Sequence, residues 1–423
     1  MSLKDKLFPD NRLGLDRFWS FSRGGINNFR SGLRDAVSGV EQTRSRMMEY
    51  DQLLVWAVLS LTLIGLVMVY SASITLADGP KYSSYSSNHF LIRHLISLAI
   101  ALGVGIWAFK IPSKVWDRYS PIIFGVTLLL LVAVLIPGLG KGVNGAKRWI
   151  PLGVMNFQPS ELMKFATVIF AATYTVQRQE HLHTFIKGML PMGIAVALVG
   201  ALLMLEPDMG AFIVVALIAF GILFLGGINA KLFGGLVLVG ITSASTIIAL
   251  SPFRRGRILA FMDPWQVDNA ANKGYQLTHS LMAFGRGEWF GTGLGGSVEK
   301  LHYLPEAHTD FILAVIGEEL GFVGVLVMIF LFYWIVRRSF MIGRTALQLD
   351  RSFAGLAAKG VGIWIGWQAF INMGVNLGLL PTKGLTLPLV SYGGSGILMN
   401  AIAIAMLLRI DYENRVLMRG GKL

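Results

Sequence analysis

The chain has 423 residues, of which 54% are apolar and 14% are charged, and its formal net charge is +13. Soluble domains carry about 25% charged residues, so this composition excludes an ordinary soluble protein, and in a membrane protein a positive charge favours basic flanking loops over a nucleic-acid partner. The absence of cysteine excludes disulfides, thiolate metal sites and cysteine nucleophiles.

Residues 1–52 contain no apolar run long enough to cross a bilayer, and they mix Lys and Arg with Asp and Glu. They also lack the apolar core and the small-residue cleavage site of a signal peptide. We therefore expect a cytoplasmic N-terminal tail, with an interfacial helix near residues 27–48.

Ten segments in the rest of the chain are candidates for membrane-spanning helices. A bilayer core about 30 Å thick needs roughly 20 apolar residues per helix. Long uncharged runs meet this need at 53–77, 119–140, 188–205, 209–230, 232–253, 360–382 and 384–408. Segments with polar interruptions add 94–109, 165–177 and 311–336. We predict an all-α integral membrane protein with ten transmembrane helices over residues 53–410 and a cytoplasmic tail at 411–423.

An even number of crossings places both termini on one side of the membrane. Lys and Arg are concentrated in the segments on that side, and the short loops on the other side carry far fewer. By the positive-inside rule the termini are cytoplasmic. The long segment 251–309 then faces outward, and it is the natural place for chemistry because it is the largest piece outside the membrane apart from the N-terminal tail.

A carboxylate lies at the point where this outer segment enters the eighth predicted helix. Residues 303–310 (YLPEAHTD) end in Asp310, at the outer face of the membrane. A carboxylate fixed there can accept a proton from a sugar hydroxyl. The alternative is a helix cap supplied by Thr309 or by Asp310 itself, and the residues alone favour the cap.

Two further polar groups have both a functional and a structural interpretation. Glu161 and Lys164 are three residues apart at the start of the fourth predicted helix, so they share a face, either in a substrate cavity or as a structural ion pair. The basic run that contains Arg148 either meets a pyrophosphate or, with Trp149, anchors the chain at the interface. Its other basic residues are Lys141 and Lys147.

Three more patterns are interpreted as structural. Glu318 and Glu319 lie deeper in the eighth predicted helix and are expected to face the bundle interior. Residues 206–208 (EPD) separate two apolar runs and predict an external turn, since proline breaks a helix. Residues 291–296 (GTGLGG) match the dinucleotide fingerprint by letter, but they follow no predicted strand and are therefore predicted to be a loop.

Three motifs together resemble the signature of the SEDS family (shape, elongation, division and sporulation proteins). They are residues 306–311 (EAHTDF) followed by 317–321 (GEELG), residues 158–164 (QPSELMK), and residues 388–395 (PLVSYGGS). The resemblance extends over residues 50–415 and includes the ten-helix layout. Residues 380–388 (LPTKGLTLP) are similar to the cell-division members of the family rather than to the elongation members.

The resemblance implies a peptidoglycan glycosyltransferase that polymerises lipid II on the outer face of the bacterial cytoplasmic (inner) membrane, at the division septum. It implies that Asp310 is catalytic, as the general base. The candidate substrate-binding or cavity residues are Glu161, Lys164, Arg148, His308 and Ser391.

The resemblance also implies partners: a class B penicillin-binding protein, which is a transpeptidase, and other divisome proteins. The charge of the leaving pyrophosphate would be offset by Lys164, by Arg148 or by a divalent cation (Mg or Mn). Such a cation would be held together with the substrate pyrophosphate, because no local cluster of residues forms a dedicated metal site.

Two other functions fit the same residues. A lipid II flippase also has polar groups inside a helical bundle, but alternating access requires a site near the bilayer midplane. A polymerase requires its essential groups on one face, where Asp310 is expected. The other alternative is a non-catalytic divisome scaffold, in which Asp310 and Glu161 have structural roles.

Overall fold

The computed structural model describes residues 50–422, apart from 80–84, 144–145, 152 and 154–155. The chain forms two compact units, residues 1–51 and 52–423. The predicted tail at 1–52 and its interfacial helix near 27–48 lie outside the described residues, except for residues 50–52.

In the second unit, each predicted span coincides in large part with one helix. These helices are α2 (Gln52–Ser73), α3 (His89–Phe109), α4 (Ser113–Leu135), α5 (Pro159–Gln177), α6 (Leu190–Leu205), α7 (Met209–Leu225), α8 (Ala230–Leu250), α12 (Ile312–Gln348), α13 (Ser352–Asn376) and α14 (Gly394–Met418). Among the described residues, seven helices are long and apolar enough to cross a membrane, and α7 is apolar but shorter. The protein is thus a multi-pass membrane protein. Short 3₁₀ or π segments are Ile74–Asp78, Gln179–His181 and Phe185–Met189.

Several predicted helix boundaries are wrong, most clearly that of the last helix. It begins at Gly394 rather than at 384, and it ends at Met418 rather than at 408. Residues 381–387 are neither helix nor strand. Their apolar side chains, such as Leu385 and Leu387, are buried against the bundle, so the hydropathy signal here comes from burial in protein and not from a helix.

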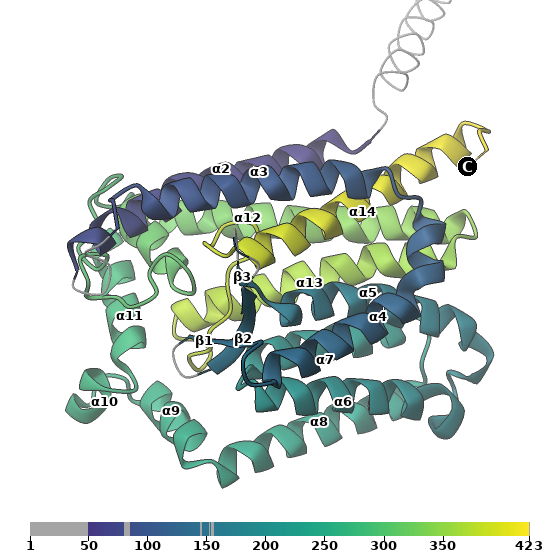
Figure 1. Cartoon of the computed structure of the whole chain (residues 1–423), viewed down its shortest axis with the longest axis horizontal. Coiled ribbons are helices and arrows are strands. Elements are labelled where there is room, and N and C mark those ends of the chain that lie inside the picture. The colour runs from purple at the N-terminus through teal and green to yellow at the C-terminus, as the bar shows by residue number, and fades with distance from the viewer. Residues whose placement is uncertain (1–49, 80–84, 144–145, 152, 154–155, 423) are drawn as a thin grey trace, which may run out of the picture. The chain divides into compact units, whose positions relative to one another are not determined.

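Successive helices run in opposite directions, so that the connections alternate between the two ends of the bundle (Figure 1). The start of α2 and the end of α14 lie at one end. The opposite end holds the connections α2–α3, α4–α5, α6–α7, α8–α12 and α13–α14, and it is called the site end below.

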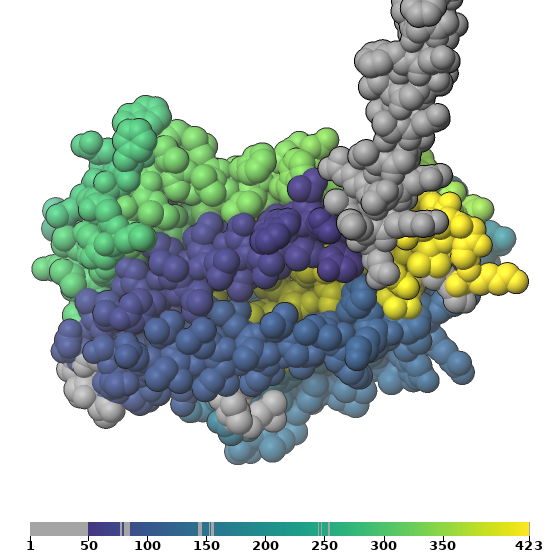
Figure 2. Space-filling model, turned by 90° about the horizontal axis from the view of Figure 1, so that it is seen from above, coloured from purple at the N-terminus to yellow at the C-terminus, as the bar shows by residue number. Residues whose placement is uncertain are grey.

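The centre of the bundle is formed by α5 and α13. In α5, 14 of the 19 residues are buried, and the helix packs against α4, α7 and α13. Neither α5 nor α13 is among the seven strongly apolar helices, because a helix surrounded by protein can carry polar groups that lipid would exclude. By contrast, α8 lies at the edge with its main contacts to α9 and α7. On another face, part of α14 is visible between α2 and α3 (Figure 2).

A small antiparallel sheet at the site end accompanies the helices that the sequence predicted. Its strands are β1 (Lys141–Val143), β2 (Ala146–Pro151) and β3 (Asn156–Phe157), in the order β1-β2-β3. Trp149 pairs with Lys141 on one side of β2, and Ile150 pairs with Phe157 on the other. The strands have two to six residues, too few for an alternating pattern to reveal them in the sequence.

The long outer segment contains three helices, α9 (Pro252–Met262), α10 (Val267–Ala271) and α11 (Tyr275–Gly287), and its last loop is inserted into α12. α12 is interrupted at Gly321, where φ is 67°. At the break, the two N–H groups that follow Gly321 donate to carbonyls of the loop instead of to the helix. The two helix carbonyls that would otherwise accept from them accept from N–H groups of the loop. The four bonds are Phe322 N to Glu288 O (2.9 Å), Val323 N to Trp289 O (3.2 Å), Thr292 N to Glu318 O (2.9 Å) and Gly293 N to Glu319 O (3.1 Å).

The side chains of Glu318 and Glu319 hold the same loop. Glu318 accepts a hydrogen bond from the Val298 N–H (2.8 Å), and Glu319 pairs with Lys300 (2.7 Å) and accepts from the Ser71 hydroxyl (2.6 Å). Both carboxylates are fully buried, as predicted for structural groups. Residues 291–296 form a loop, as the sequence also predicted.

Candidate active site

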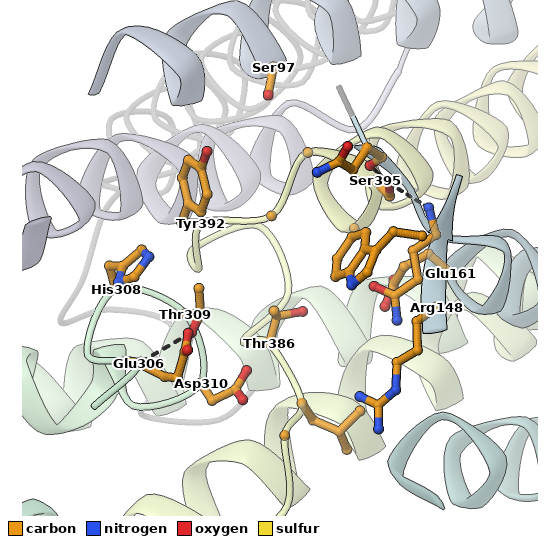
Figure 3. A pocket seen from close by; sticks show the side chains of 18 of the residues that line it. Ser97, Arg148, Glu161, Glu306, His308, Thr309, Asp310, Thr386, Tyr392 and Ser395 are labelled. Carbon is orange, nitrogen blue, oxygen red and sulfur yellow. Dashed lines mark hydrogen bonds between the residues drawn. The ribbon is translucent and has the colours of Figure 1, made fainter. Parts of the chain in front are cut away.

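The site end of the bundle contains a cavity of about 500 Å³. Its walls come from α3, from β2, from the first turns of α5, and from the connections that precede α7, α12 and α14 (Figure 3). Segments far apart in the sequence therefore meet at one place. The ionisable side chains in the wall are Arg93, Arg148, Glu161, Asp208, Glu306, His308, Asp310 and Tyr392.

Asp310 lies in the cavity wall and does not cap α12. The N-cap of that helix is Phe311, and neither Asp310 nor Thr309 makes a side-chain bond to its first turn. The Thr309 hydroxyl instead donates to the Glu306 carboxylate (2.9 Å). The cap interpretation is therefore wrong, and among the described residues no group donates a hydrogen bond to the Asp310 carboxylate.

The backbone around Asp310 is held by two asparagines of α13. The side-chain amides of Asn372 and Asn376 donate to the Asp310 carbonyl at 2.8 and 3.0 Å. On the carboxylate side, a Cβ atom placed on Gly384 would lie 2.9 Å from Asp310 Oδ2. A glycine at 384 thus leaves the space that the carboxylate occupies.

The electrostatic surroundings favour the protonated form of Asp310. Burial raises the pKa of Asp310 to about 7, and the negative charges of Glu306 and Asp208 act in the same direction, against the opposing charge of Arg148. A carboxylate with a pKa near neutrality is a stronger proton acceptor than one with a pKa near 4, and about half of it is still ionised at pH 7.

Glu161 reaches the cavity, whereas Lys164 does not. Lys164 is fully buried behind Glu161, with its ammonium 2.7 Å from Glu161 Oε1 and 2.8 Å from Gln368 Oε1. The pair is therefore a structural ion pair, and placing Lys164 in the cavity was wrong. The second carboxylate oxygen of Glu161 is buried with no hydrogen-bond partner among the described residues, and it lies at the cavity wall.

Arg148 is held beside the cavity by the α6–α7 turn. Its guanidinium donates to the carbonyls of Glu206 (2.9 Å) and Pro207. The predicted turn is present, and Asp208 both caps α7 by accepting from the Ala211 N–H (3.2 Å) and lines the cavity. Burial raises the pKa of Glu206 to about 8, with a further increase from Asp208 and a decrease from Arg148.

Trp149, which follows Arg148 in β2, also lines the cavity. Lys141 and Lys147 are exposed and lie outside the wall, so the sheet presents only part of the run to the cavity.

His308 lines the cavity as predicted, and Ser391 does not. Ser391 is buried, donates to the Thr309 carbonyl (2.6 Å) and accepts from the Leu387 N–H (2.8 Å), so it fastens the connection before α14 to the segment that carries Asp310. The Tyr392 N–H donates to the His308 carbonyl (3.0 Å), which extends this attachment.

Sequence reasoning missed several wall residues, notably Phe90 and Tyr392. The rings of Phe90, His308 and Tyr392 lie 5.0 to 5.6 Å apart and form an aromatic side of the cavity. Tyr392 belongs to one of the motifs quoted above, which was the available signal. Phe90 carries no such signal, because an aromatic residue at a helix start is ordinary in membrane proteins.

The described residues contain no group of three or more His, Asp or Glu side chains that could hold a metal ion. Two acidic side chains of the wall are bonded to neighbouring protein groups, Glu161 to Lys164 and Asp208 to the start of α7. The donor set therefore does not fit a metal bound by protein alone.

A family model for cell cycle proteins, FtsW/RodA/SpoVE, matches residues 52–416. The chain is 88% identical over 423 residues, covering 100% of both proteins, to a probable peptidoglycan glycosyltransferase FtsW of Polynucleobacter necessarius subsp. necessarius. It is 67% identical over 398 residues to a protein of the same description from Burkholderia thailandensis, covering 94% of this chain and 86% of the relative.

Solved structures share the fold. One, from work on the structural coordination of polymerization and crosslinking by a peptidoglycan synthase complex, has a TM-score of 0.71 and 27% identity, covering 86% of this chain and 98% of its own. The rod shape determining protein RodA of Thermus thermophilus has a TM-score of 0.62 and 25% identity, covering 87% and 99%.

Proposed function

The chain belongs to the FtsW/RodA/SpoVE family of cell cycle proteins, and on that premise we propose that it is a peptidoglycan glycosyltransferase that polymerises lipid II during cell division. The observation that carries the assignment is the Asp310 carboxylate. It faces a cavity at the site end, caps no helix, and accepts no hydrogen bond from the described residues.

The proposed reaction transfers the growing glycan to an incoming lipid II. The 4-hydroxyl oxygen of the acceptor sugar attacks the anomeric carbon of the donor, while Asp310 accepts the hydroxyl proton. The bond between that carbon and the pyrophosphate oxygen breaks, so configuration at the carbon inverts and undecaprenyl pyrophosphate leaves. Positioning the two substrates in one cavity is itself a large part of such catalysis.

The negative charge of the leaving pyrophosphate must be offset by cations. Arg148 is suited to this role because it lines the cavity. Its guanidinium has five N–H groups, and only two of them are needed for the hydrogen bonds to the carbonyls of the α6–α7 turn. Lys164 is excluded from the role by its burial behind Glu161. We propose that a divalent cation, Mg or Mn, is bound only together with the substrate pyrophosphate, because the residues that the structure describes provide no three-ligand site.

The proposed location is the bacterial cytoplasmic membrane at the division septum, with both termini in the cytoplasm and the site end outside. The parity of the helices supports a common side for the termini, and the distribution of Lys and Arg supports the orientation. The proposed partners are a class B penicillin-binding protein and other divisome proteins. The likeness to a chain of a peptidoglycan synthase complex supports the first of these.

The substitution Asp310→Asn tests the function. It is expected to reduce polymerisation of lipid II by about 10²–10⁴-fold, the usual contribution of a general base, while fold and partner binding persist. The measurements are glycan-strand length from lipid II, thermal stability and co-purification with the transpeptidase. Asp263→Asn, an exposed acid of the same outer segment, is the matched control.

A folded, partner-bound Asp310→Asn protein that polymerises at the wild-type rate would contradict the proposal. Lipid II flipping in the same preparation would then identify a flippase, and the loss of both activities without loss of division would identify a scaffold. The position of the cavity at one end of the bundle, rather than at its middle, favours the polymerase.

A further inference from the structure

Cations of α9 gather against the connection that precedes α14. Arg254 and Arg257 are three residues apart in α9 and therefore share a face. Lys383, in the connection before α14, is within electrostatic reach of both: burial and then the positive charges of Arg257 and Arg254 lower its pKa. Arg255, on another face of α9, is exposed.

A fourth cation joins this group from α10–α11. Lys273 extends toward α9, where a Cβ atom on Gly256 would lie 2.2 Å from its ammonium nitrogen. In the part of the chain that the structure describes, Arg254, Lys273 and Lys383 form no ion pair with a carboxylate. Like charges held close together repel one another, so a neighbouring anion would stabilise this arrangement.

A second cavity, of about 870 Å³, lies beside these cations. Its lining is mostly polar and includes Arg257, Lys273, Asn269, Asn272, Gln276 and Thr382. Asp268 is the acidic residue in this lining, so the two cations leave a positive excess. Side-chain amides beside cations suit a ligand that has both hydroxyl and carboxylate groups.

The position of the second cavity relative to Asp310 indicates which ligand this is. Thr382 lies in its wall, and Gly384, two residues later, is in contact with the Asp310 carboxylate. α9 and α10 lie at the site end, beyond the end of α8 (Figure 1). A lipid-linked pyrophosphate stays at membrane level, whereas a glycan strand extends away from the membrane as it grows.

Resting on the proposed function, we infer that the second cavity holds the growing glycan strand through the carboxylates of its peptides, with Arg257 and Lys273 as the principal ligands. The strand would then leave the reaction site past residues 382–384. A polymerase that binds its product in this way is processive: it adds many units before the strand is released.

Binding can be measured without catalysis, in the Asp310→Asn protein. The probe is a lipid-free glycan fragment that carries its peptides, compared with the same fragment after the peptides are removed and with inorganic pyrophosphate. The peptide-bearing fragment is expected to bind, and Arg257→Gln/Lys273→Gln is expected to weaken binding by roughly tenfold for each cation removed. Arg255→Gln, on the other face of α9, is the matched control and is expected to have no effect.

In the catalytically intact chain, Arg257→Gln/Lys273→Gln is expected to shorten the glycan strands. In the binding experiment, equal affinity of the peptide-bearing fragment for the Asp310→Asn protein with and without Arg257→Gln/Lys273→Gln would overturn the inference. Equal affinity for the peptide-bearing and the peptide-free glycan would also overturn it. Displacement of the fragment by pyrophosphate alone would assign the cavity to the diphosphate and also overturn it. Because binding is measured in the Asp310→Asn background, its failure is distinguishable from failure of the proposed function.

Discussion

Asp310 directly precedes the N-cap of α12, a place where a carboxylate ordinarily serves the helix. Here the side chain points away from the first turn of α12 and does not cap it. Two asparagines of α13 fix the carbonyl of Asp310, and Gly384 leaves room for its carboxylate. The residue is therefore held rigidly while its proton-accepting atoms face the cavity, which is the preorganisation that general-base catalysis requires.

The pKa of Asp310 predicts a pH dependence of catalysis. The proposed general base acts when ionised, and its pKa is raised to about 7, so kcat/KM for lipid II is expected to rise with pH through about 7 and then level. Measurement of kcat/KM from pH 5 to 9 checks this. A profile that is already flat at pH 5 would contradict the raised pKa.

The same pKa predicts the sign of an effect on stability. A carboxyl group whose pKa is higher in the folded than in the unfolded chain binds its proton more tightly when folded. Its contribution to the free energy of unfolding is therefore fully present below pH 4 and is lost as pH rises from 3.8 to about 7. Thermal unfolding of the wild type and of Asp310→Asn over this range checks it, since the variant should lack this part of the pH dependence.

At the residue scale, the sequence predicted which residues gather at the cavity better than it predicted where their side chains point. Asp310, Glu161, Arg148 and His308 all line the cavity as expected. Lys164 lies on the same helical face as Glu161, yet its longer side chain turns inward to Gln368, a partner more than 200 residues away. No local pattern could reveal that partner.

At the scale of elements, α12 is the most informative helix. An interruption in a helix normally leaves backbone groups without partners, which is costly away from water. Here residues 288–293 supply partners for all four groups at the Gly321 break. The outer segment is thus attached to the helix directly after Asp310 by main-chain as well as by side-chain bonds.

Gly291→Ala tests this attachment. At Gly291 φ is 80° and an added Cβ would lie 2.2 Å from the Glu319 carbonyl oxygen, so backbone strain and overpacking should each cost about 1–3 kcal/mol. Gly295→Ala is a matched control, with the same φ of 80° and open space around the added Cβ. Thermal unfolding in detergent should show a larger loss for Gly291→Ala. Equal losses would show that the contact with α12 contributes nothing.

Hydropathy was sufficient to find the ten long helices, but it did not predict the structure of the segments that connect them. The sheet was missed because its strands are short, and the last helix was started too early because the buried segment 381–387 is apolar without being helical. The break at Gly321 was also invisible, since Gly is common in membrane helices.

At the scale of the molecule, the alternation of helix direction places the cavity and α9–α11 at the end opposite the two ends of the membrane unit. Only one of the two possible orientations puts Asp310 where lipid II is polymerised. Orientation and function are therefore linked.

A thiol introduced by Val267→Cys tests the orientation in this cysteine-free chain. Val267 is 82% exposed and begins α10, so it should react with a membrane-impermeant maleimide in intact spheroplasts. Lys422→Cys, at the opposite end, should react only after permeabilisation. The reverse pattern would place the cavity in the cytoplasm and remove the basis for the proposed reaction.

The burial of α5 has a consequence for biogenesis. This helix carries Glu161 and Lys164 in its first turns and is too polar to qualify as a span by itself. Charged residues oppose insertion by up to about 2.5–3.5 kcal/mol each at the helix centre, so α5 should leave the translocon efficiently only when α7 and α13, which are synthesised later, can receive it. A topology reporter fused after Arg178 should therefore report incomplete insertion, and Glu161→Leu/Lys164→Leu should restore it. Complete insertion of the unaltered truncated chain would show that α5 enters the membrane without its neighbours.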